Sequence, residues 1–258
     1  GTLTVTPTHS TGSVNATLAS IAASYSHSLT IPSWTSGVTN TSVEINNSAS
    51  VAGTAIAAWD NGDLAIAWTR PIYSGTTQHV LALSFYDGSS WTTQDIDTAS
   101  KTGYRPSIAI DNQGALHIAY LDKDNTNLRY ATNASGSWVL STLDSSSVNP
   151  SNDAAKTGIA IDNKGHVHII HPVSGSGVWV LNYTTNVSGS FVSTTITDTT
   201  EDDGKYASLA IAGNGSLHIS VYRDSGGSDL RYYTDETGVW TNETVHTGSN
   251  YGKDSAIA

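Results

Sequence analysis

The chain repeats one pattern at a period of about 50 residues, and this period restricts the fold more than any other feature. The clearest copy is SIAIDNQGALHIAY. Four equivalent glycines, Gly62, Gly114, Gly165 and Gly215, follow one another at spacings of 52, 51 and 50 residues. A β-rich repeat of this length is typical of propeller blades, because a single unit cannot bury its apolar face alone.

Each unit predicts four short strands. In the clearest copy the first strand is apolar (107–110), and an Asp-Asn-x-Gly turn leads into the second strand, LHIAY. The third strand is NLRYAT (127–132), and the fourth follows a Ser-Gly step and an aromatic residue. We expect the repeated aromatics to pack one unit on the next; they are Trp91, Trp138, Phe191 and Trp240.

The repeat predicts an all-β fold, a five-bladed β-propeller in one domain spanning residues 1–258. The expected blades are 254–258 with 1–50, then 51–103, 104–154, 155–204 and 205–253. The N-terminus resembles a second strand without its first, and the C-terminus a first strand without its second. We therefore expect closure by a C-terminal strand that pairs with the N-terminal blade; its residues are Asp254, Ser255, Ala256, Ile257 and Ala258.

This closure has more than one form. The strand can complete a blade of its own molecule, which is the simplest arrangement. It can instead complete a neighbouring molecule, and such strand donation would build a head-to-tail polymer. The sequence begins at Gly1 without methionine, so we also expect a processed chain or one cut from a longer protein.

Composition restricts the partners and the location. The net charge is −11 with only 11 lysines and arginines, and no basic cluster exists, so we expect no nucleic acid partner. No apolar run approaches the length of about 18 residues that a membrane span needs. Eight Asn-x-Ser/Thr sequons favour an extracellular or cell-surface glycoprotein; their asparagines are Asn15, Asn40, Asn46, Asn133, Asn182, Asn186, Asn214 and Asn242.

Histidines offer the first candidate metal ligands. His117, His168 and His218 occupy equivalent positions in three units. Equivalent positions in neighbouring blades are too far apart for one zinc ion, whose ligands lie about 2 Å from it. We therefore expect each histidine to bond the backbone of a neighbouring blade. His166 and His171 lie beside His168 in one strand, but only residues 166 and 168 share a face.

Carboxylates offer the second set. Asp111 and Asp162 stand where an aspartate caps the Asp-Asn-x-Gly turn. Asp122 and Asp124 alternate like the start of a calcium loop, but the later glycine and the distal glutamate of an EF-hand are missing, so they are weak candidates for a cation site. We interpret the acidic run 201–203 as a solvated loop, and we expect no cofactor.

Catalytic groups are harder to find. A glycosidase needs two carboxylates about 5–10 Å apart. The chain has four glutamates, none of them predicted on an innermost strand, and no Gly-x-Ser-x-Gly nucleophile motif. We therefore expect no catalytic residue and a chain that is not an enzyme.

The repeat S-x-A-I-D-N-x-G-x-x-H-I-x-Y, followed by L-R-Y-A-T and S-G-S-W, resembles the propeller repeats of large secreted and cell-surface proteins of bacteria and archaea. Resemblance to five-bladed lectins of the tachylectin type implies one sugar site per blade. A lectin with one site per blade should repeat its loop residues. The loops between the second and third strands diverge in sequence, which argues against this lectin function; they are 73–78, 123–127, 173–177 and 224–228.

The main functional hypothesis is a non-enzymatic building block of the cell surface, as a surface-layer, adhesin or filament subunit. Its partners would be copies of itself, other surface proteins or glycans. The first alternative is a carbohydrate-binding lectin, and the second is a glycan-active hydrolase.

Overall fold

The computed structural model describes residues 53–73, 77–145, 154–175, 177–197, 199–225, 228–248 and 252–257. The chain divides into two units, Gly1–Val43 and Glu44–Ala258, and every described residue belongs to the second. The expected N-terminal blade, residues 1–50, therefore lies outside the described residues. In the described ranges there is no helix that could cross a membrane.

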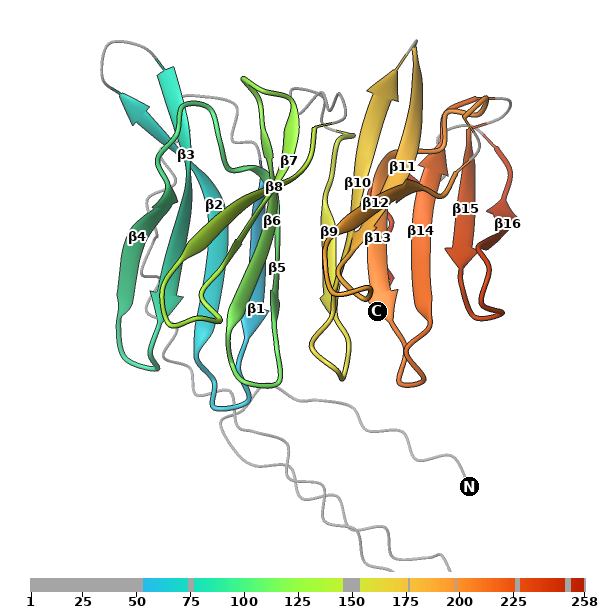
Figure 1. Ribbon diagram of the computed structural model, residues 1–258. Coiled ribbons are helices and arrows are strands. Elements are labelled where there is room, and N and C mark those ends of the chain that lie inside the picture. The colour runs from blue at the N-terminus through green and yellow to red at the C-terminus, as the bar shows by residue number, and fades with distance from the viewer. Residues whose placement is uncertain are drawn as a thin grey trace, which may run out of the picture. The chain divides into compact units, whose positions relative to one another are not determined.

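The described residues form four sheets of four antiparallel strands (Figure 1). The first contains β1 (Thr54–Ala58), β2 (Leu64–Tyr73), β3 (Thr77–Tyr86) and β4 (Trp91–Asp97). The second contains β5 (Tyr104–Ile110), β6 (Leu116–Asp122), β7 (Asn127–Thr132) and β8 (Val139–Asp144). The third contains β9 (Gly158–Ile161), β10 (Val167–Gly175), β11 (Val178–Thr185) and β12 (Val192–Thr195). The fourth contains β13 (Lys205–Ile211), β14 (Leu217–Arg223), β15 (Asp229–Thr234) and β16 (Thr241–His246).

Within each sheet the strands pair in sequence order, so each repeat is one meander. The all-β class and the four-stranded antiparallel units are confirmed, and the arrangement is consistent with a propeller. The turn between β5 and β6 shows why the repeat keeps its glycine. Gly114 has φ 84° and donates its N–H to the Asp111 carbonyl oxygen at 3.0 Å, a left-handed conformation that glycine adopts without strain.

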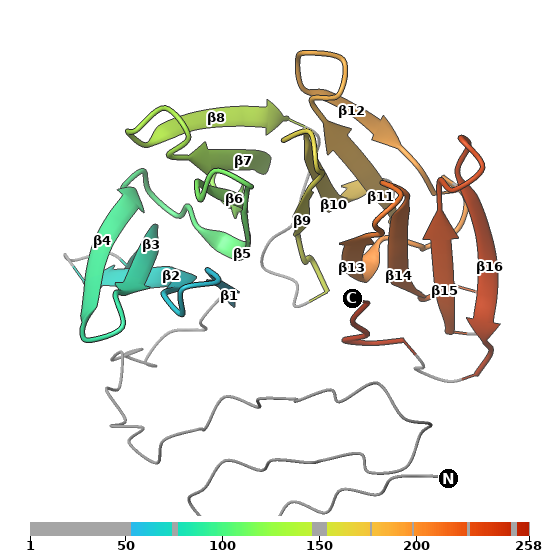
Figure 2. The ribbon, with the colours of Figure 1, turned by 90° about the horizontal axis from the view of Figure 1, so that it is seen from below.

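Successive sheets contact each other through their first strands. β1 lies beside β5, β5 beside β9, and β9 beside β13 (Figure 2). The apolar core lies between the sheets. Alternate residues of β6 point to opposite sides, so Ile118 and Tyr120 pack with the first sheet, while Ala119 and Leu121 pack with the third. All seven residues of β6 are consequently buried.

Three of the four repeated aromatics pack sheet on sheet, as predicted, whereas Trp91 contacts Tyr86 of its own sheet. Phe191 contacts Tyr130 of the preceding sheet with ring centroids 5.3 Å apart, and Trp240 contacts Tyr183 at 5.4 Å. Trp138 packs against the core between the first two sheets.

The expected closure strand is only partly described. Residues 252–257 form no ladder with another described strand, and they contact β13 and β14 of the fourth sheet. Ser255 Oγ donates to Ser220 Oγ at 3.0 Å, and the Ile257 N–H donates to Ser208 Oγ at 3.3 Å. Ala258 lies outside the described residues, so the fifth blade and the closure remain predictions.

Three glycines mark where the chain enters a new unit against the third strand of the preceding sheet. A Cβ on Gly103 would lie 2.6 Å from the Leu81 backbone, and one on Gly204 would lie 2.5 Å from the Val180 carbonyl oxygen. A Cβ on Gly252 would lie 3.0 Å from Leu230 Cα. The segment that begins at Gly252 therefore packs on the third strand of the fourth sheet, just as the residues before β5 and β13 pack on the third strands of the first and third sheets.

This close approach predicts that Gly204→Ala destabilises the protein by about 2 kcal/mol, because overpacking against a fixed backbone typically costs about 1–3 kcal/mol. Gly213→Ala is the matched control, since a Cβ there meets nothing within 4 Å and the φ of Gly213 is not left-handed. Urea unfolding of both variants checks the prediction. Equal midpoints for the two variants would contradict it.

Candidate functional site

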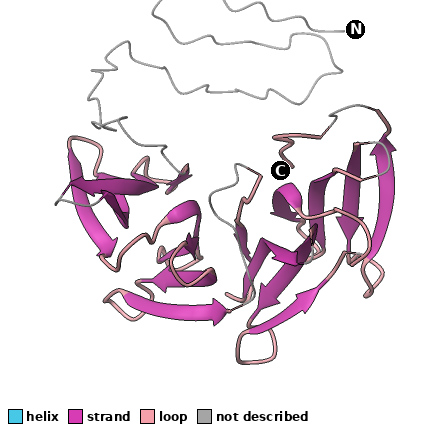
Figure 3. Ribbon diagram, turned by 90° about the horizontal axis from the view of Figure 1, so that it is seen from above, coloured by secondary structure: helices cyan, strands magenta, loops and turns pink. Residues whose placement is uncertain are grey.

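One pocket, of about 730 Å³, lies where the first strands of the four sheets meet the C-terminal segment. Figure 2 shows β1, β5, β9 and β13 as the innermost strands of their sheets, with the C-terminal segment beside β13, and Figure 3 shows the same strands from the opposite side. The lining residues come from five segments that are far apart in the sequence; they are 53–55, 105–108, 156–159, 206–209 and 254–256.

The backbone at the pocket holds three non-glycine residues in the left-handed region. Arg105 has φ 50°, Tyr206 has φ 53° and Asp254 has φ 57°. The pairing register shifts between residues 104 and 107 and between 205 and 208, so Arg105 and Tyr206 sit in β-bulges that redirect their side chains. Each such residue costs about 1–2 kcal/mol. Strain of this kind concentrates at functional sites.

The pocket combines charges, an aromatic ring and hydroxyl groups. Lys156 forms an ion pair with Asp254, and its Nζ lies 5.7 Å from the centre of the Tyr206 ring. Thr157 Oγ1 lies 2.9 Å from Ser107 Oγ and donates to the Arg105 carbonyl oxygen at 2.6 Å. A concave site with a few convergent polar groups is the usual form of a small-ligand site.

Sequence reasoning missed three of these residues, Arg105, Lys156 and Tyr206. They stand 51 and 50 residues apart, the same spacings as the turn glycines, so they are repeat-equivalent. The sequence does contain a signal for this site. The equivalent position carries a different residue in each unit, although the strands beside it repeat. Gly53, with φ 125°, holds the equivalent place in the first sheet.

The three repeated histidines lie elsewhere, each inside its own sheet. His117 Nδ1 bonds the Tyr130 hydroxyl. His168 Nδ1 bonds the Tyr183 hydroxyl at 2.6 Å. His218 Nδ1 bonds the Tyr232 hydroxyl at 2.5 Å.

The structural role predicted for these histidines fits, but the predicted partner is wrong. The reason is that the residue two positions beyond each histidine pairs directly with the tyrosine on the third strand, which brings the ring and the hydroxyl together on one face.

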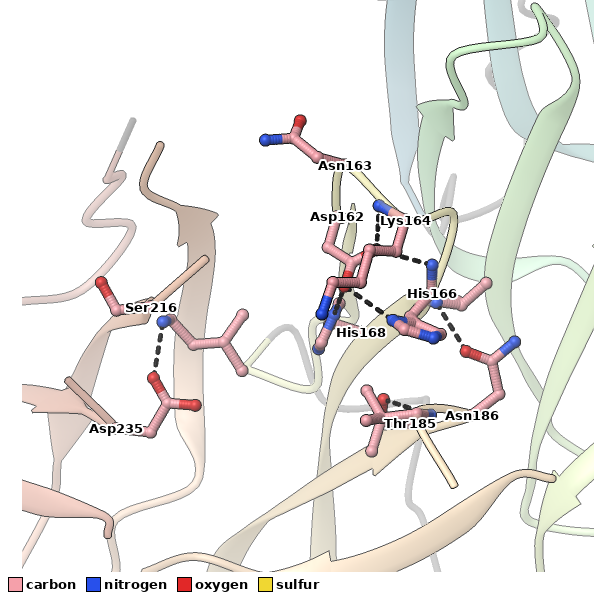
Figure 4. Close-up of polar contacts among 12 residues, drawn as sticks. Asp162, Asn163, Lys164, His166, His168, Thr185, Asn186, Ser216 and Asp235 are labelled. Atoms are coloured by element: carbon pink, nitrogen blue, oxygen red, sulfur yellow. Dashed lines mark hydrogen bonds and ion pairs between the residues drawn. The ribbon is translucent and has the colours of Figure 1, made fainter. Parts of the chain in front are cut away.

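The cluster of His166, His168 and His171 divides between two faces, as expected. His166 Nδ1 lies 2.7 Å from Asp162 Oδ2 (Figure 4). His171 is fully buried, and its Nε2 lies 3.2 Å from Asp144 Oδ2. Among the described residues no three histidines or carboxylates are grouped so that they could hold a metal ion.

The turn carboxylates cap their turns, as predicted. Asp162 Oδ1 accepts the N–H groups of Lys164 at 2.9 Å and His166 at 2.7 Å (Figure 4). Asp111 Oδ1 accepts those of Gln113 and Ala115 in the same way. Partial burial by itself would raise the pKa of Asp162, but the hydrogen bonds from His166 and Lys164 lower that pKa to about 2.

The weak cation candidates carry other contacts. Asp122 Oδ1 accepts the N–H groups of Asp124 and Asn125, both at 3.0 Å. Asp124 pairs with Lys101 at 2.7 Å. A cation at Asp122 and Asp124 stays a prediction without added support from the described residues.

The interpretation of residues 201–203 as a solvated loop is wrong. Asp203 has no exposed surface and accepts the Tyr233 hydroxyl at 2.6 Å, and burial raises the pKa of its carboxyl. Glu201 lies 3.1 Å from Arg223 and 2.8 Å from Arg231. These two arginines come from the fourth sheet and supply the positive charge that makes burial of the acids tolerable.

The sequon asparagines differ in their surroundings. Asn214 and Asn242 are exposed. Asn133 and Asn186 cap turns, because each side-chain oxygen accepts a strand N–H at 2.7 Å. Asn182 is 6% exposed, and its amide donates to Asp144 Oδ2 at 3.0 Å, so a glycan does not fit there in the folded chain. Asn15, Asn40 and Asn46 lie outside the described residues.

The capping carboxylates give a pH prediction. Because the pKa of Asp162 is lowered from 3.8 to about 2, its contribution to stability is present above pH 4 and is lost as the pH falls towards 2. Asp162→Asn should cost about 2 kcal/mol at pH 6, since one pKa unit corresponds to about 1.4 kcal/mol. Urea unfolding between pH 6 and pH 2 checks this. The gap between wild type and variant should narrow with acid, and a constant gap would contradict the prediction.

Known structures share this fold at low sequence identity. A lectin of Aleuria aurantia, solved with Fucα1-6GlcNAc, matches with TM-score 0.53 and 17% identity over 77% of this chain and 63% of the lectin. An α-L-arabinanase of Penicillium chrysogenum matches with TM-score 0.52 and 12% identity over 75% and 66%. An α-L-arabinofuranosidase of family GH93 from Fusarium graminearum matches with TM-score 0.54 and 10% identity over 76% and 66%.

This chain therefore spans about two thirds of the length of these structures. At such identities the likeness shows the fold alone. No protein-family model matches the chain, and no curated protein matches it in sequence.

The comparisons overturn one expectation. The sequence led us to expect a chain that is not an enzyme, but two of these structures are glycoside hydrolases. The expectation failed because it assigned catalytic acids only from predicted strand positions. The structures that share this fold thus include a lectin and two glycoside hydrolases.

Proposed function

We propose that this chain binds glycans in the pocket formed by its first strands. The observation that carries the proposal is the convergence of Arg105, Lys156 and Tyr206 with several hydroxyl groups at one strained, concave site. A sugar offers hydroxyls for such polar groups and an apolar ring face for an aromatic side chain. The shared fold with a lectin and with arabinan-active hydrolases supports the same substrate class.

Glycan binding is tested by screening the purified chain on a glycan array and measuring affinity for the best ligand. Tyr206→Ala should weaken binding about tenfold, or about 1.4 kcal/mol, because the ring is the aromatic surface of the pocket. Tyr86→Ala is the control, since its hydroxyl bonds Gly88 away from the pocket. A loss of equal size in both variants would count against a site at this pocket.

Glycan hydrolysis is the second candidate function, and Asp254 favours it. Among the described residues that line the pocket, Asp254 carries the carboxylate, and it lies on the C-terminal segment. A glycosidase needs a second carboxylate beside it, which the described lining residues do not supply. Residues outside the described ranges would have to supply that group.

Hydrolysis is tested with chromogenic arabinosides and with arabinan oligosaccharides. If Asp254 acts on the glycosidic bond, Asp254→Asn should lower the rate by at least about a hundredfold, the range typical for loss of a general acid or base. Turnover that survives the substitution unchanged would remove Asp254 from this role. Absence of turnover with retained binding would leave glycan binding as the function.

We also propose that residues 254–258 and residues 1–50 together form a fifth sheet, within one molecule or between two. One observation supports this. Gly252 enters against β15 as Gly103 and Gly204 enter against the strands before them. A location at the cell surface and self-association belong to the same proposal.

The fifth sheet predicts the behaviour of a chain that ends at Gly252. Such a chain should unfold at lower urea concentration, because the fourth sheet would lose the cover that the other sheets receive. Light scattering at several concentrations separates the two forms of closure. A stable monomer that truncation destabilises fits closure within one molecule, and filaments that truncation dissolves fit closure between molecules. Unchanged stability and assembly would contradict both forms.

A further inference from the structure

Two basic residues line the pocket of an acidic protein. The chain has 22 acidic residues against 11 lysines and arginines. Among the described residues of the lining, Arg105 and Lys156 are basic and Asp254 is acidic. A basic side chain in a cleft attracts ligands of negative charge.

The partner of Lys156 is a carboxylate of the C-terminal segment. The side chains of Lys156 and Asp254 are 38% and 67% exposed, so water screens their ion pair. An exposed pair of this kind contributes about 0–1 kcal/mol to stability. A carboxylate that arrives from solution can therefore take the place of Asp254 at little cost.

Asp254 can change its contacts without movement of the segment that bears it. Side-chain hydrogen bonds at Ser220 and Ser208 hold the neighbouring residues Ser255 and Ile257. The Asp254 side chain is 67% exposed, so a change of its rotamer takes the carboxylate away from Lys156 while the segment and the sheets stay in place.

The Tyr206 ring adds a second preference. Lys156 Nζ lies 5.7 Å from the centre of this ring, and the same ring lines the pocket. A sugar that packs on the ring would place its substituents beside Lys156. A carboxylate on that sugar would form a charge-assisted hydrogen bond, which is stronger than a bond to a hydroxyl.

We propose that the pocket selects glycans that carry a carboxylate, as uronic and sialic acids do, and that the ligand carboxylate replaces Asp254 at Lys156. Arg105 is a second basic residue in the pocket lining. This inference rests on the proposed glycan binding and specifies its ligand class.

Calorimetry on the full chain tests the inference with two matched ligand pairs. Trigalacturonate is compared with its methyl ester, and sialyllactose with its methyl ester, so that each pair differs only in the charge of the carboxylate and the pairs separate uronic from sialic acids. The acid of at least one pair should bind about tenfold more tightly than its neutral partner, and added salt should reduce this preference.

Two variants at the ion pair should act in opposite directions. Lys156→Gln should abolish the preference for the acid. Asp254→Asn should raise the affinity for the acid about threefold relative to that for the neutral partner, because it removes the competing carboxylate. Lys101→Gln is the matched control, since Lys101 pairs with Asp124 outside the pocket lining and is similarly exposed. Urea midpoints confirm that each variant is folded.

Two results would overturn the inference. Equal affinity for acid and neutral partner, with equal weakening of both in Lys156→Gln, would leave glycan binding intact and remove the selectivity. A weaker acid complex in Asp254→Asn would show that Asp254 assists the ligand and does not compete with it. Absence of binding to any glycan on the array would remove the proposed function together with this inference.

Discussion

Burial of apolar surface between successive sheets is the interaction on which the rest of the structure depends. One sheet exposes an apolar face on each side, and only stacking removes both faces from water. The second strand of each repeat shows the consequence, since alternate side chains of β6 serve the interfaces with two different sheets. The entry glycines serve the same packing, because Gly103 and Gly204 let the chain pass directly over the backbone of the preceding sheet.

Buried polar groups keep a partner in each repeat, but the partner differs. In the second sheet His117 bonds both Asp111 and Tyr130. In the fourth sheet Ala212 stands at the aspartate position, and His218 bonds Tyr232 and Ser216. In the first sheet Ala65 replaces the histidine, and Trp59 stands at the aspartate position and donates its Nε1–H to the Gly114 carbonyl oxygen at 3.1 Å. A buried polar group is costly without a partner, so each substitution comes with another contact.

The pocket depends on differences between the repeats. The first strands of the sheets meet at the pocket because the units share one fold, but the residue at the equivalent position differs from unit to unit. Arg105, Lys156 and Tyr206 give one site a charge pattern and a ring that no single repeat contains. The fold leaves the chemistry open, since lectins and hydrolases share it. Function therefore has to be argued from this site.

The sequence by itself determined the local structure. The alternation of apolar residues predicted residues 127–132 as the strand that is β7, and the Asp-Asn-x-Gly turn predicted the cap at Asp162. These features depend on neighbours within a few residues, so the pattern contains them. Only the tertiary structure decided the burial of Asp203, the tyrosine partners of the histidines and the pocket itself. The tyrosine partners depend on the pairing register of neighbouring strands, and the burial of Asp203 depends on contacts with a strand about 30 residues away. The approach of Arg105, Lys156 and Asp254 is set by sheet packing and not by local sequence.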